Sequence, residues 1–210
     1  MSHSYQIVQP STWPRAMHCS IFRQYAQPMY SVSFDLDITA FLPWIRQNSW
    51  PFTPAMVYAV TRCANLVEAF RYRFVDGEIA LYDKIDTSFT YIDPGKELFK
   101  VVNVPMQDSM ADYVRLATAT IDAQDVYFTG PMGNDIYQFS AFPWVSFTHI
   151  SHTDSGKKDN ATPLFDWGKF YERDGRVLLP FSVQVHHSFV DGIHIGQFAE
   201  ILQDYLNAPS

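Results

Sequence analysis

The stretch that most constrains the fold is an alternating run that ends in two histidines. In FSVQVHH, residues 181–187, apolar side chains stand at positions 181, 183 and 185 and polar ones stand between them. This period of two predicts a β-strand with one apolar face, and His187 continues that face at the strand's end. Gly192 closes the following SFVDG segment and suits a turn. A part-buried histidine at such a terminus suits a general base, because neutral imidazole accepts a proton near pH 7.

The rest of the chain mixes strand and helix patterns without a regular β-α-β rhythm, which favours an α+β fold. Two hairpin turns are predicted at Asp76-Gly77 and Asp174-Gly175. Alternating or β-rich patterns predict strands within residues 29–38, 70–83, 86–93, 139–150 and 164–185. Helical spacing predicts helices within residues 10–25, 39–47, 53–70 and 106–125 and at the C-terminus, where Phe198, Ile201, Leu202, Tyr205 and Leu206 form an apolar stripe.

Two helix starts carry capping signals. Ser11 or Thr12 is expected to cap the first helix, with Pro14 in its first turn. Thr53 is expected to cap the third helix, with Pro54 at its first position.

Length and charge narrow the class of protein. The 210 residues predict a single domain, 1–210, with a substantial core. A net charge of −7 argues against nonspecific binding to nucleic acid or to an anionic membrane, although a local basic patch could hold a small anion. No apolar run reaches transmembrane length, and the N-terminus lacks an apolar signal core, so a cytoplasmic protein is expected.

The residues alone leave the chemistry of the histidines open. A hydrogen-bonded structural histidine and a general base are both consistent with the position of His187. A metal site at His187 and His194 is disfavoured, because no cysteine or second carboxylate cluster accompanies them. A serine hydrolase is disfavoured too, since GxSxG is absent. Cys19 and Cys63 are expected to be buried free thiols.

The histidine motif resembles that of a known family. HHxxxDG, residues 186–192, is similar to the active-site motif of chloramphenicol acetyltransferases, which dihydrolipoyl acyltransferase cores and peptide-synthetase condensation domains share. Further segments resemble the first family at similar spacing over almost the whole chain: 13–18, 36–42, 76–78, 143–147 and 178–187.

The resemblance implies a two-layer sandwich, a mixed sheet with helices packed on one face. It implies a homotrimer whose active sites lie between subunits, with acetyl-CoA as co-substrate, a small-molecule acceptor and no metal. It makes His187 the base in a direct transfer without an acyl-enzyme. Ser140 would donate to the tetrahedral intermediate, while Asp191 would pair with Arg15 and hold the loop that carries His187.

The resemblance also implies coenzyme and acceptor contacts. Lys169, Phe170 and Phe52 correspond to coenzyme-binding positions. Phe22, Phe99, Ile150, and Tyr127 or Phe128 correspond to walls of the acceptor pocket. The pocket is expected to be more polar than is usual, since His152, Asp154 and Asp166 replace leucine, valine and threonine. The alternative is that the loop follows a different path and leaves the pocket apolar.

Three functions follow as alternatives. The first is chloramphenicol O-acetylation, with weakened binding because Asp154 or Asp166 would be desolvated without a cationic partner. The second is acetylation of a more polar hydroxyl or amine acceptor. The third is a noncatalytic trimeric ligand-binding protein, against which the intact set of His187, Ser140, Asp191 and Arg15 argues.

Overall fold

The structure is a computed structural model that describes residues 3–130, 133–153, 156–157 and 159–209. The helices are α1 (Ala16–Phe22), α2 (Phe41–Gln47), α3 (Phe52–Leu66), the 3-10 turn η1 (Glu68–Arg71), α4 (Met110–Ala123) and α5 (Gly192–Asn207). The strands are β1 (Tyr5–Ile7), β2 (Met29–Asp37), β3 (Tyr72–Val75), β4 (Glu78–Tyr82), β5 (Asp86–Tyr91), β6 (Lys100–Val104), β7 (Ile136–Phe142), β8 (Leu164–Gly168), β9 (Tyr171–Arg173) and β10 (Arg176–His186).

A seven-stranded mixed sheet forms the centre of the molecule. Its strand order is β2-β10-β8-β7-β5-β6, with β9 paired to β10. The pairs β5·β7 and β7·β8 are parallel, and the remaining pairs are antiparallel. A second sheet, β1-β4-β3, is built on the predicted hairpin, whose turn residues Asp76 and Gly77 both have positive φ. The mixture of parallel and antiparallel pairs agrees with the predicted α+β class.

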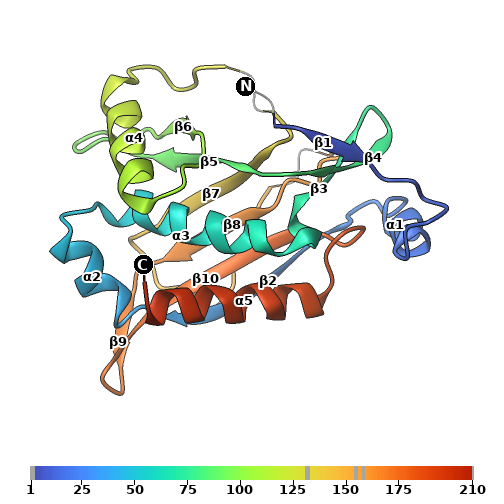
Figure 1. The fold of residues 1–210 in the computed structure, drawn as a ribbon. Coiled ribbons are helices and arrows are strands. Elements are labelled where there is room, and N and C mark those ends of the chain that lie inside the picture. The colour runs from blue at the N-terminus through green and yellow to red at the C-terminus, as the bar shows by residue number, and fades with distance from the viewer. Residues whose placement is uncertain (1–2, 131–132, 154–155, 158, 210) are drawn as a thin grey trace.

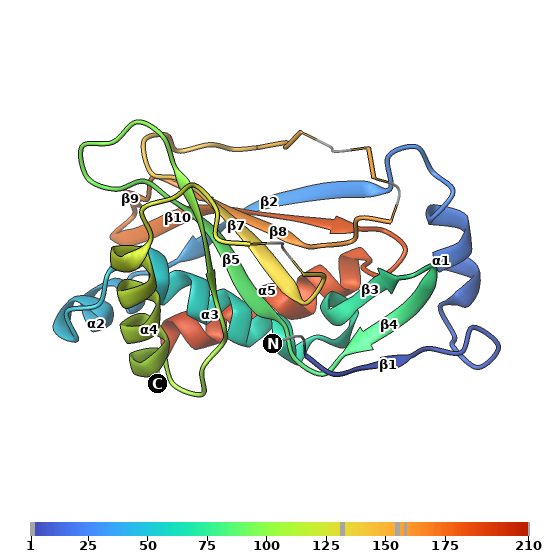
Figure 2. The same ribbon diagram turned by 90° about the horizontal axis from the view of Figure 1, so that it is seen from above.

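The helices α3 and α5 lie side by side along one face of the large sheet (Figure 1). The loops that follow β5 and β7 run over the opposite face (Figure 2). The predicted two-layer arrangement is confirmed, and the long β2 and β10 ribbon carries the histidine motif to the end of the sheet that lies near α1.

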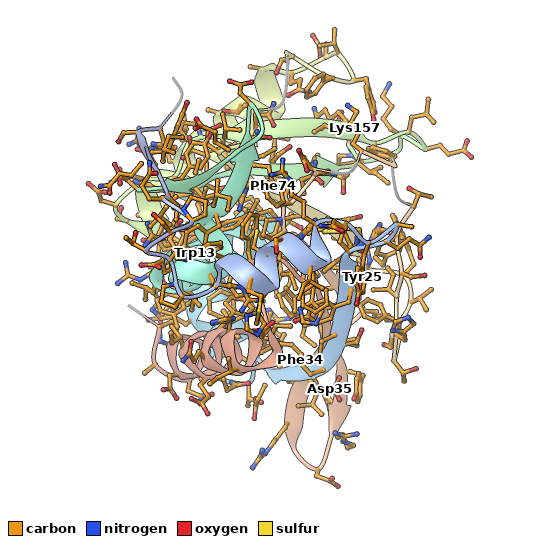
Figure 3. The ribbon with its side chains drawn as sticks, turned by 90° about the vertical axis from the view of Figure 1, so that its right-hand side faces the viewer. Trp13, Tyr25, Phe34, Asp35, Phe74 and Lys157 are labelled. Carbon is orange, nitrogen blue, oxygen red and sulfur yellow. The ribbon has the colours of Figure 1, made fainter. Side chains whose placement is uncertain are left out.

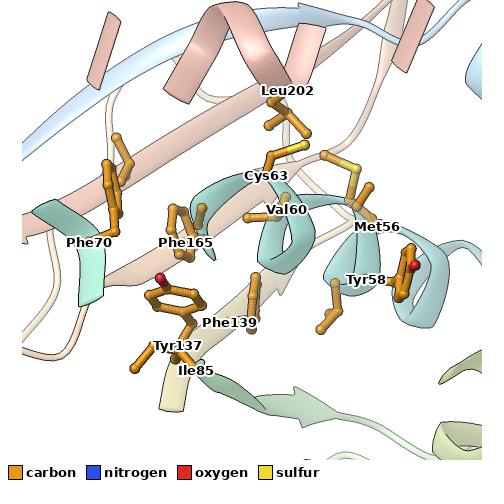
Figure 4. Close-up of a cluster of buried hydrophobic side chains, with 14 of the residues drawn as sticks. Met56, Tyr58, Val60, Cys63, Phe70, Ile85, Tyr137, Phe139, Phe165 and Leu202 are labelled. Atoms are coloured by element: carbon orange, nitrogen blue, oxygen red, sulfur yellow. The ribbon is translucent and has the colours of Figure 1, made fainter. Parts of the chain in front are cut away.

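The core lies between the large sheet and these two helices. Phe165 of β8 is at its centre and contacts the rings of Phe139, Phe181 and Phe198 at 5.4–6.0 Å between centroids. Figure 4 shows Val60 of α3 facing Phe139, and Leu202 of α5 beside Cys63 of α3. Each buried aromatic ring contributes about 1.5–3 kcal/mol of hydrophobic stabilisation, so this layer fixes the sheet beneath the site.

Both predicted helix starts are wrong. The first helix begins at Ala16 with Arg15 as its N-cap, and residues before it form turns in which Thr12 Oγ1 bonds the carbonyl of Gln9. The third begins at Phe52 with Pro51 as its N-cap, so Thr53 already lies inside it. In both cases tertiary contacts override local capping: Arg15 reaches the histidine turn, and Phe52 packs on Trp167.

One strand prediction is wrong, and two short strands were missed. β7 ends at Phe142, so residues 143–150, expected to continue a strand, form the loop over the open face of the sheet. The short strands β1 and β6 were not predicted, because three and five residues of mixed character carry little periodic signal.

Cys19 and Cys63 are free and buried, as expected. Within the described residues, no helix is long and apolar enough to cross a membrane.

Candidate active site

His187 directly follows β10, and its ring is held between two aromatic side chains. Phe22 of α1 stacks on it with centroids 3.8 Å apart and ring planes at 9°, while Tyr30 of β2 lies at 4.8 Å. The backbone N–H of His187 donates to the carbonyl of Pro28, which extends the β2·β10 pairing by one residue. The side chain keeps 37% of its surface exposed. The base predicted at the strand's end is therefore fixed in orientation yet still accessible.

Asp191 lies against one nitrogen of that ring. His187 Nδ1 is 3.1 Å from Asp191 Oδ1, at an angle unsuited to a hydrogen bond, and it is enclosed by protein atoms. A carboxylate at this distance favours a proton on Nδ1 over one on Nε2. The unprotonated nitrogen is then Nε2, on the other side of the ring.

Arg15 clamps the whole turn that bears His187. Its Nη2 donates to Asp191 Oδ1 at 2.6 Å and to the carbonyl of His187 at 2.9 Å, and its Nε donates to the carbonyl of Ser188 at 2.8 Å. The hydrogen bonds from Arg15 lower the pKa of Asp191, because the guanidinium stabilises the ionised carboxylate. The pairing that the resemblance implies is present, and Arg15 also binds the turn directly.

The two histidines that flank His187 in sequence, His186 in the motif and His194 just after it, have structural partners. His186 is buried, and its Nδ1 accepts a hydrogen bond from the backbone N–H of Ser188. His194 Nδ1 accepts from the backbone N–H of Asp191 at 2.9 Å, where α5 begins. The sequence alone indicates no role for His194. The signal that could have found it is its place three residues after an aspartate at a helix start, the spacing of a capping box.

Ser140 lies in β7, away from His187. Ser140 pairs with Asp166 across β7 and β8, and Asp166 pairs with Ser182 across β8 and β10. His187 lies five residues beyond Ser182 along the line of β10. With about 3.3 Å per residue and about 4.8 Å between strands, the Cα atoms of Ser140 and His187 are roughly 19 Å apart in one chain.

A cavity of about 520 Å³ opens beside Ser140. Its walls come from the start of α3, the loop after β5 and the end of β7, and they include Phe99, Phe142 and Trp144. Lys100 fixes the loop after β5, because its ammonium binds Asp93 at 2.9 Å and two carbonyls at the end of α4. Ser140 therefore faces a formed hollow rather than open surface.

Asp166 has a partner that sequence analysis did not foresee. Its Oδ1 is 2.7 Å from Nε2 of His152, which lies in the loop over the open face of the sheet. Asp166 is fully buried, and this desolvation raises its pKa. Asp166 is therefore desolvated, as expected, but it has a hydrogen-bonding partner in His152. The two polar replacements at positions 152 and 166 bind each other. Asp154, the third polar replacement, lies outside the described residues.

The residues expected to contact the coenzyme come together at one corner. Phe52 and Phe170 have ring centroids 6.1 Å apart, and Lys169 is bound through its backbone to Val145. Gly168 is required here, because a Cβ at that position would stand 2.6 Å from the carbonyl oxygen of Val145. This close approach holds the loop after β7 against the end of β8.

The residues expected to line the acceptor pocket lie at three places in the structure. Phe22 lies with His187, where its ring face covers the imidazole. Phe99 and Tyr127 contact each other at 5.6 Å near Ser140, and Phe99 lines the cavity there. Ile150 belongs to the loop that covers Asp166. Within one chain, the residues expected to line the acceptor pocket are therefore far apart, as His187 and Ser140 are.

Comparisons with known proteins point to one family over nearly the whole length of the chain. The family model described as chloramphenicol acetyltransferase matches residues 3–203. A chloramphenicol acetyltransferase from Klebsiella sp is 30% identical over 204 residues, 96% of this chain and 93% of that protein. Chloramphenicol acetyltransferase 2 from Haemophilus influenzae is 32% identical over 197 residues, 92% of each.

Solved structures show the same relationship. A chloramphenicol acetyltransferase structure superposes with a TM-score of 0.89 at 27% identity, covering 97% of this chain and 100% of that one. A probable dihydrolipoamide acetyltransferase from Listeria monocytogenes shares the fold, with a TM-score of 0.61 at 13% identity over 93% of this chain and 90% of that one.

Proposed function

Because this chain belongs to the chloramphenicol acetyltransferase family, we propose that it transfers the acetyl group of acetyl-CoA to a hydroxyl of chloramphenicol. The observation that carries the proposal is the setting of His187. The ring is fixed by stacking, accessible at one edge, and has a carboxylate beside Nδ1. Such a histidine can act as a general base through Nε2.

The reaction is a direct transfer. Nε2 of His187 takes the proton of the acceptor hydroxyl while the oxygen attacks the carbonyl carbon of the thioester. The tetrahedral intermediate collapses by breaking the carbon–sulfur bond, and the departing thiolate takes the proton back from His187. Asp191 stabilises the transient imidazolium, since its carboxylate lies 3.1 Å from Nδ1.

Ser140 acts on the other substrate of this reaction, the thioester of acetyl-CoA. Its hydroxyl donates to the oxyanion that develops on the thioester carbonyl, where one preorganised donor contributes about 3 kcal/mol to the barrier reduction. The cavity beside Ser140 gives the thioester a place to lie. Lys169, Phe170 and Phe52 then hold the remainder of the coenzyme at the neighbouring corner.

A complete site requires two chains. A separation of roughly 19 Å between Ser140 and His187 is too long for both to touch one carbonyl group. Exposed apolar side chains accompany each half: Met17, Ile21 and Tyr25 beside His187, and Phe99, Tyr127, Trp144 and Val145 beside Ser140. Such patches favour burial against a partner.

The two patches lie at different ends of the molecule. Figure 3 looks onto α1, with Trp13 and Tyr25 at its two ends, and Figure 1 shows α1 at one end and β5 and β6 at the other. Contact between unlike ends produces a closed ring when the rotation fits. A homotrimer with three sites between subunits is the arrangement we propose.

The proposal is tested by thiol release. Purified protein, acetyl-CoA and chloramphenicol are mixed, free thiol is measured with a chromogenic disulfide, and the acetylated product is identified by mass spectrometry. We expect release that depends on both substrates. Release with another hydroxyl or amine compound but not with chloramphenicol would move the acceptor to that class. No release with chloramphenicol or with any other hydroxyl or amine compound tested would favour the noncatalytic alternative.

A further inference from the structure

A second cavity, of about 500 Å³, lies among the helices. Its walls come from the segment before α1, from the end of α3 with η1, from the turn after β10 and from α5. None of the described residues that line it also lines the cavity beside Ser140. Leu66, one of its lining residues, keeps 68% of its surface exposed, so the cavity opens to solvent. A hollow of this size can hold a small organic molecule.

One wall of this cavity is aromatic. The rings of Trp13 and Tyr72 lie 5.0 Å apart between centroids, and the ring of Phe189 lies 5.6 Å from Tyr72 and 6.2 Å from Trp13. Leu66 and Ile201 add aliphatic surface to the lining. Such a wall favours an apolar ring in the ligand, and the face of an indole also attracts a cation.

A carboxylate stands at the edge of the aromatic wall. Trp13 Nε1 donates to the Tyr72 hydroxyl at 3.2 Å, and this hydroxyl donates to Glu68 Oε1 at 2.6 Å. The two hydrogen bonds fix the carboxylate near the indole, and all three residues line the cavity. Tyr72 is a neutral partner, and within the described residues Glu68 belongs to no ion pair. The negative charge of Glu68 is therefore available to a ligand.

The other charged groups near the cavity do not cancel the charge of Glu68. The guanidinium of Arg15 is paired with the carboxylate of Asp191. His194 is neutral at pH 7, because burial and the charge of Arg15 lower its pKa. Arg71, in the same turn as Glu68, donates to two carbonyls at and just after the end of β4. The lining of the cavity therefore has a net negative charge.

We propose that this cavity binds an organic ammonium ion, a protonated amine joined by a short chain to an aromatic ring. The ring packs against the aromatic wall and Leu66, and the ammonium group lies between the carboxylate of Glu68 and the indole of Trp13. Binding here requires neither acetyl-CoA nor an acceptor, so the site is independent of the proposed function.

The cavity adjoins the residues that hold the base in place. Arg15 and His194 line it and also bind the turn that bears His187, and Phe189 lies within that turn. A ligand in the cavity therefore contacts the support of His187 from outside the active site.

The test uses a matched pair of probes. Tryptamine carries an ammonium group at neutral pH, and tryptophol has the same indole with a hydroxyl in its place. Titration calorimetry at low ionic strength measures their binding to the wild type and to Glu68→Gln, whose amide oxygen can still accept from Tyr72. We expect the wild type to bind tryptamine about fivefold or more tighter than tryptophol, because an ion pair and a cation–π contact act together. In Glu68→Gln the two affinities should agree within about twofold.

Two further variants locate the site. Glu172→Gln removes the same charge from β9, at the other end of the molecule from α1 (Figure 1), and should keep the preference of the wild type. Gln197→Trp adds a large side chain to the cavity from an exposed position on α5 and should remove the binding of both probes. Thermal melting shows whether each variant is folded, and Gln197→Trp decides the case if Glu68→Gln does not fold.

Equal affinities of the wild type for the two probes, or a preference that persists in Glu68→Gln, would overturn the proposal, and so would binding that persists in Gln197→Trp. Displacement of tryptamine by acetyl-CoA or by chloramphenicol would also overturn it, because the amine would then lie in the active site. Turnover of chloramphenicol without tryptamine binding leaves the proposed function standing and overturns this site. Tryptamine binding without turnover supports this site and counts against the proposed function.

Discussion

His187 has little rotational freedom. A ring with a stacked phenylalanine on one face and a tyrosine nearby cannot turn about its Cβ–Cγ bond without breaking these contacts. Orientation of a base is worth as much as its basicity, because proton transfer needs the nitrogen within hydrogen-bond reach of the hydroxyl. Phe22, which the family resemblance places in the acceptor pocket, stacks on His187 in this structure.

Replacing His187 with alanine should lower turnover by about 10²–10⁴-fold, the usual contribution of a positioned general base. The protein should stay folded, since the side chain is partly exposed. The measurements are kcat in the thiol-release assay and the thermal melting point. His186→Ala is the comparison, and it should lose stability because His186 is buried. Near-normal turnover in His187→Ala, with a loss in His186→Ala, would show that the base is misassigned.

Single residues were predictable to different degrees. His187 could be placed at a strand end from alternation alone, and Asp191 and Arg15 from the family resemblance. The His152–Asp166 contact could not, because position 152 belongs to an aperiodic loop whose path over the sheet depends on packing at Gly168 and Val145. In the sequence, His152 and Asp166 are two separate polar replacements. Only the structure shows that their side chains contact each other.

The turn between β10 and α5 acts as one unit with the start of α1. Arg15 crosses from α1 to bind Asp191 and two carbonyls of the turn, and His194 closes the helix start from the other side. The position of His187 thus depends on contacts between segments 172–176 residues apart in sequence. The local sequence predicts the turn, but it does not predict the hydrogen bonds that Arg15 makes to it.

We expect Arg15→Gln and Asp191→Asn each to reduce activity and to lower the free energy of unfolding by about 1.5–3 kcal/mol, the range for hydrogen bonds to charged groups. The double variant should cost less than the sum of the singles, as interacting residues do. Urea unfolding of the four proteins measures this cycle. Strict additivity would mean that the two side chains do not act on each other.

The same pair should make stability depend on pH. Because Arg15 lowers the pKa of Asp191, the unfolded chain binds the proton more readily than the folded chain. The stabilisation is complete above the ordinary aspartate pKa and is lost as pH falls through the lower, folded one. The stability difference between wild type and Asp191→Asn should therefore shrink on acidification from about pH 7 to pH 3.

Elements with strong periodicity were predicted well, and their ends were not. The alternation of β10 and the stripe of α5 place both elements, because burial on one face repeats along their length. The starts of α1 and α3 were misplaced by capping rules, since Arg15 and Phe52 are held by distant partners instead. β6 has five residues, and it forms a strand because it pairs with β5.

At the scale of the whole molecule, the site that we propose needs two residues, His187 and Ser140, whose Cα atoms lie roughly 19 Å apart in one chain. The ring that we propose joins the His187 end of one chain to the Ser140 end of the next. In such a ring, a chain defective in one half can still complete a site with its other half.

Mixed rings of His187→Ala and Ser140→Ala chains should therefore regain activity. With random assembly, roughly a quarter of the interfaces would combine an intact His187 with an intact Ser140. Coexpression should raise turnover at least tenfold above that of either variant, and light scattering should give the mass of a trimer. Mixed assemblies no more active than their parents would place the whole site within one chain.

The His152–Asp166 contact constrains how such a chain could evolve from one with leucine and threonine at these positions. An aspartate that arose first would be fully buried with no partner, at a cost large enough to purge it. A histidine that arose first keeps 21% of its side chain exposed and can be hydrated. The histidine at position 152 is therefore expected to arise before the aspartate at position 166. Once both substitutions are fixed, reversion of the histidine alone is blocked, so the lineage is committed to its carboxylate.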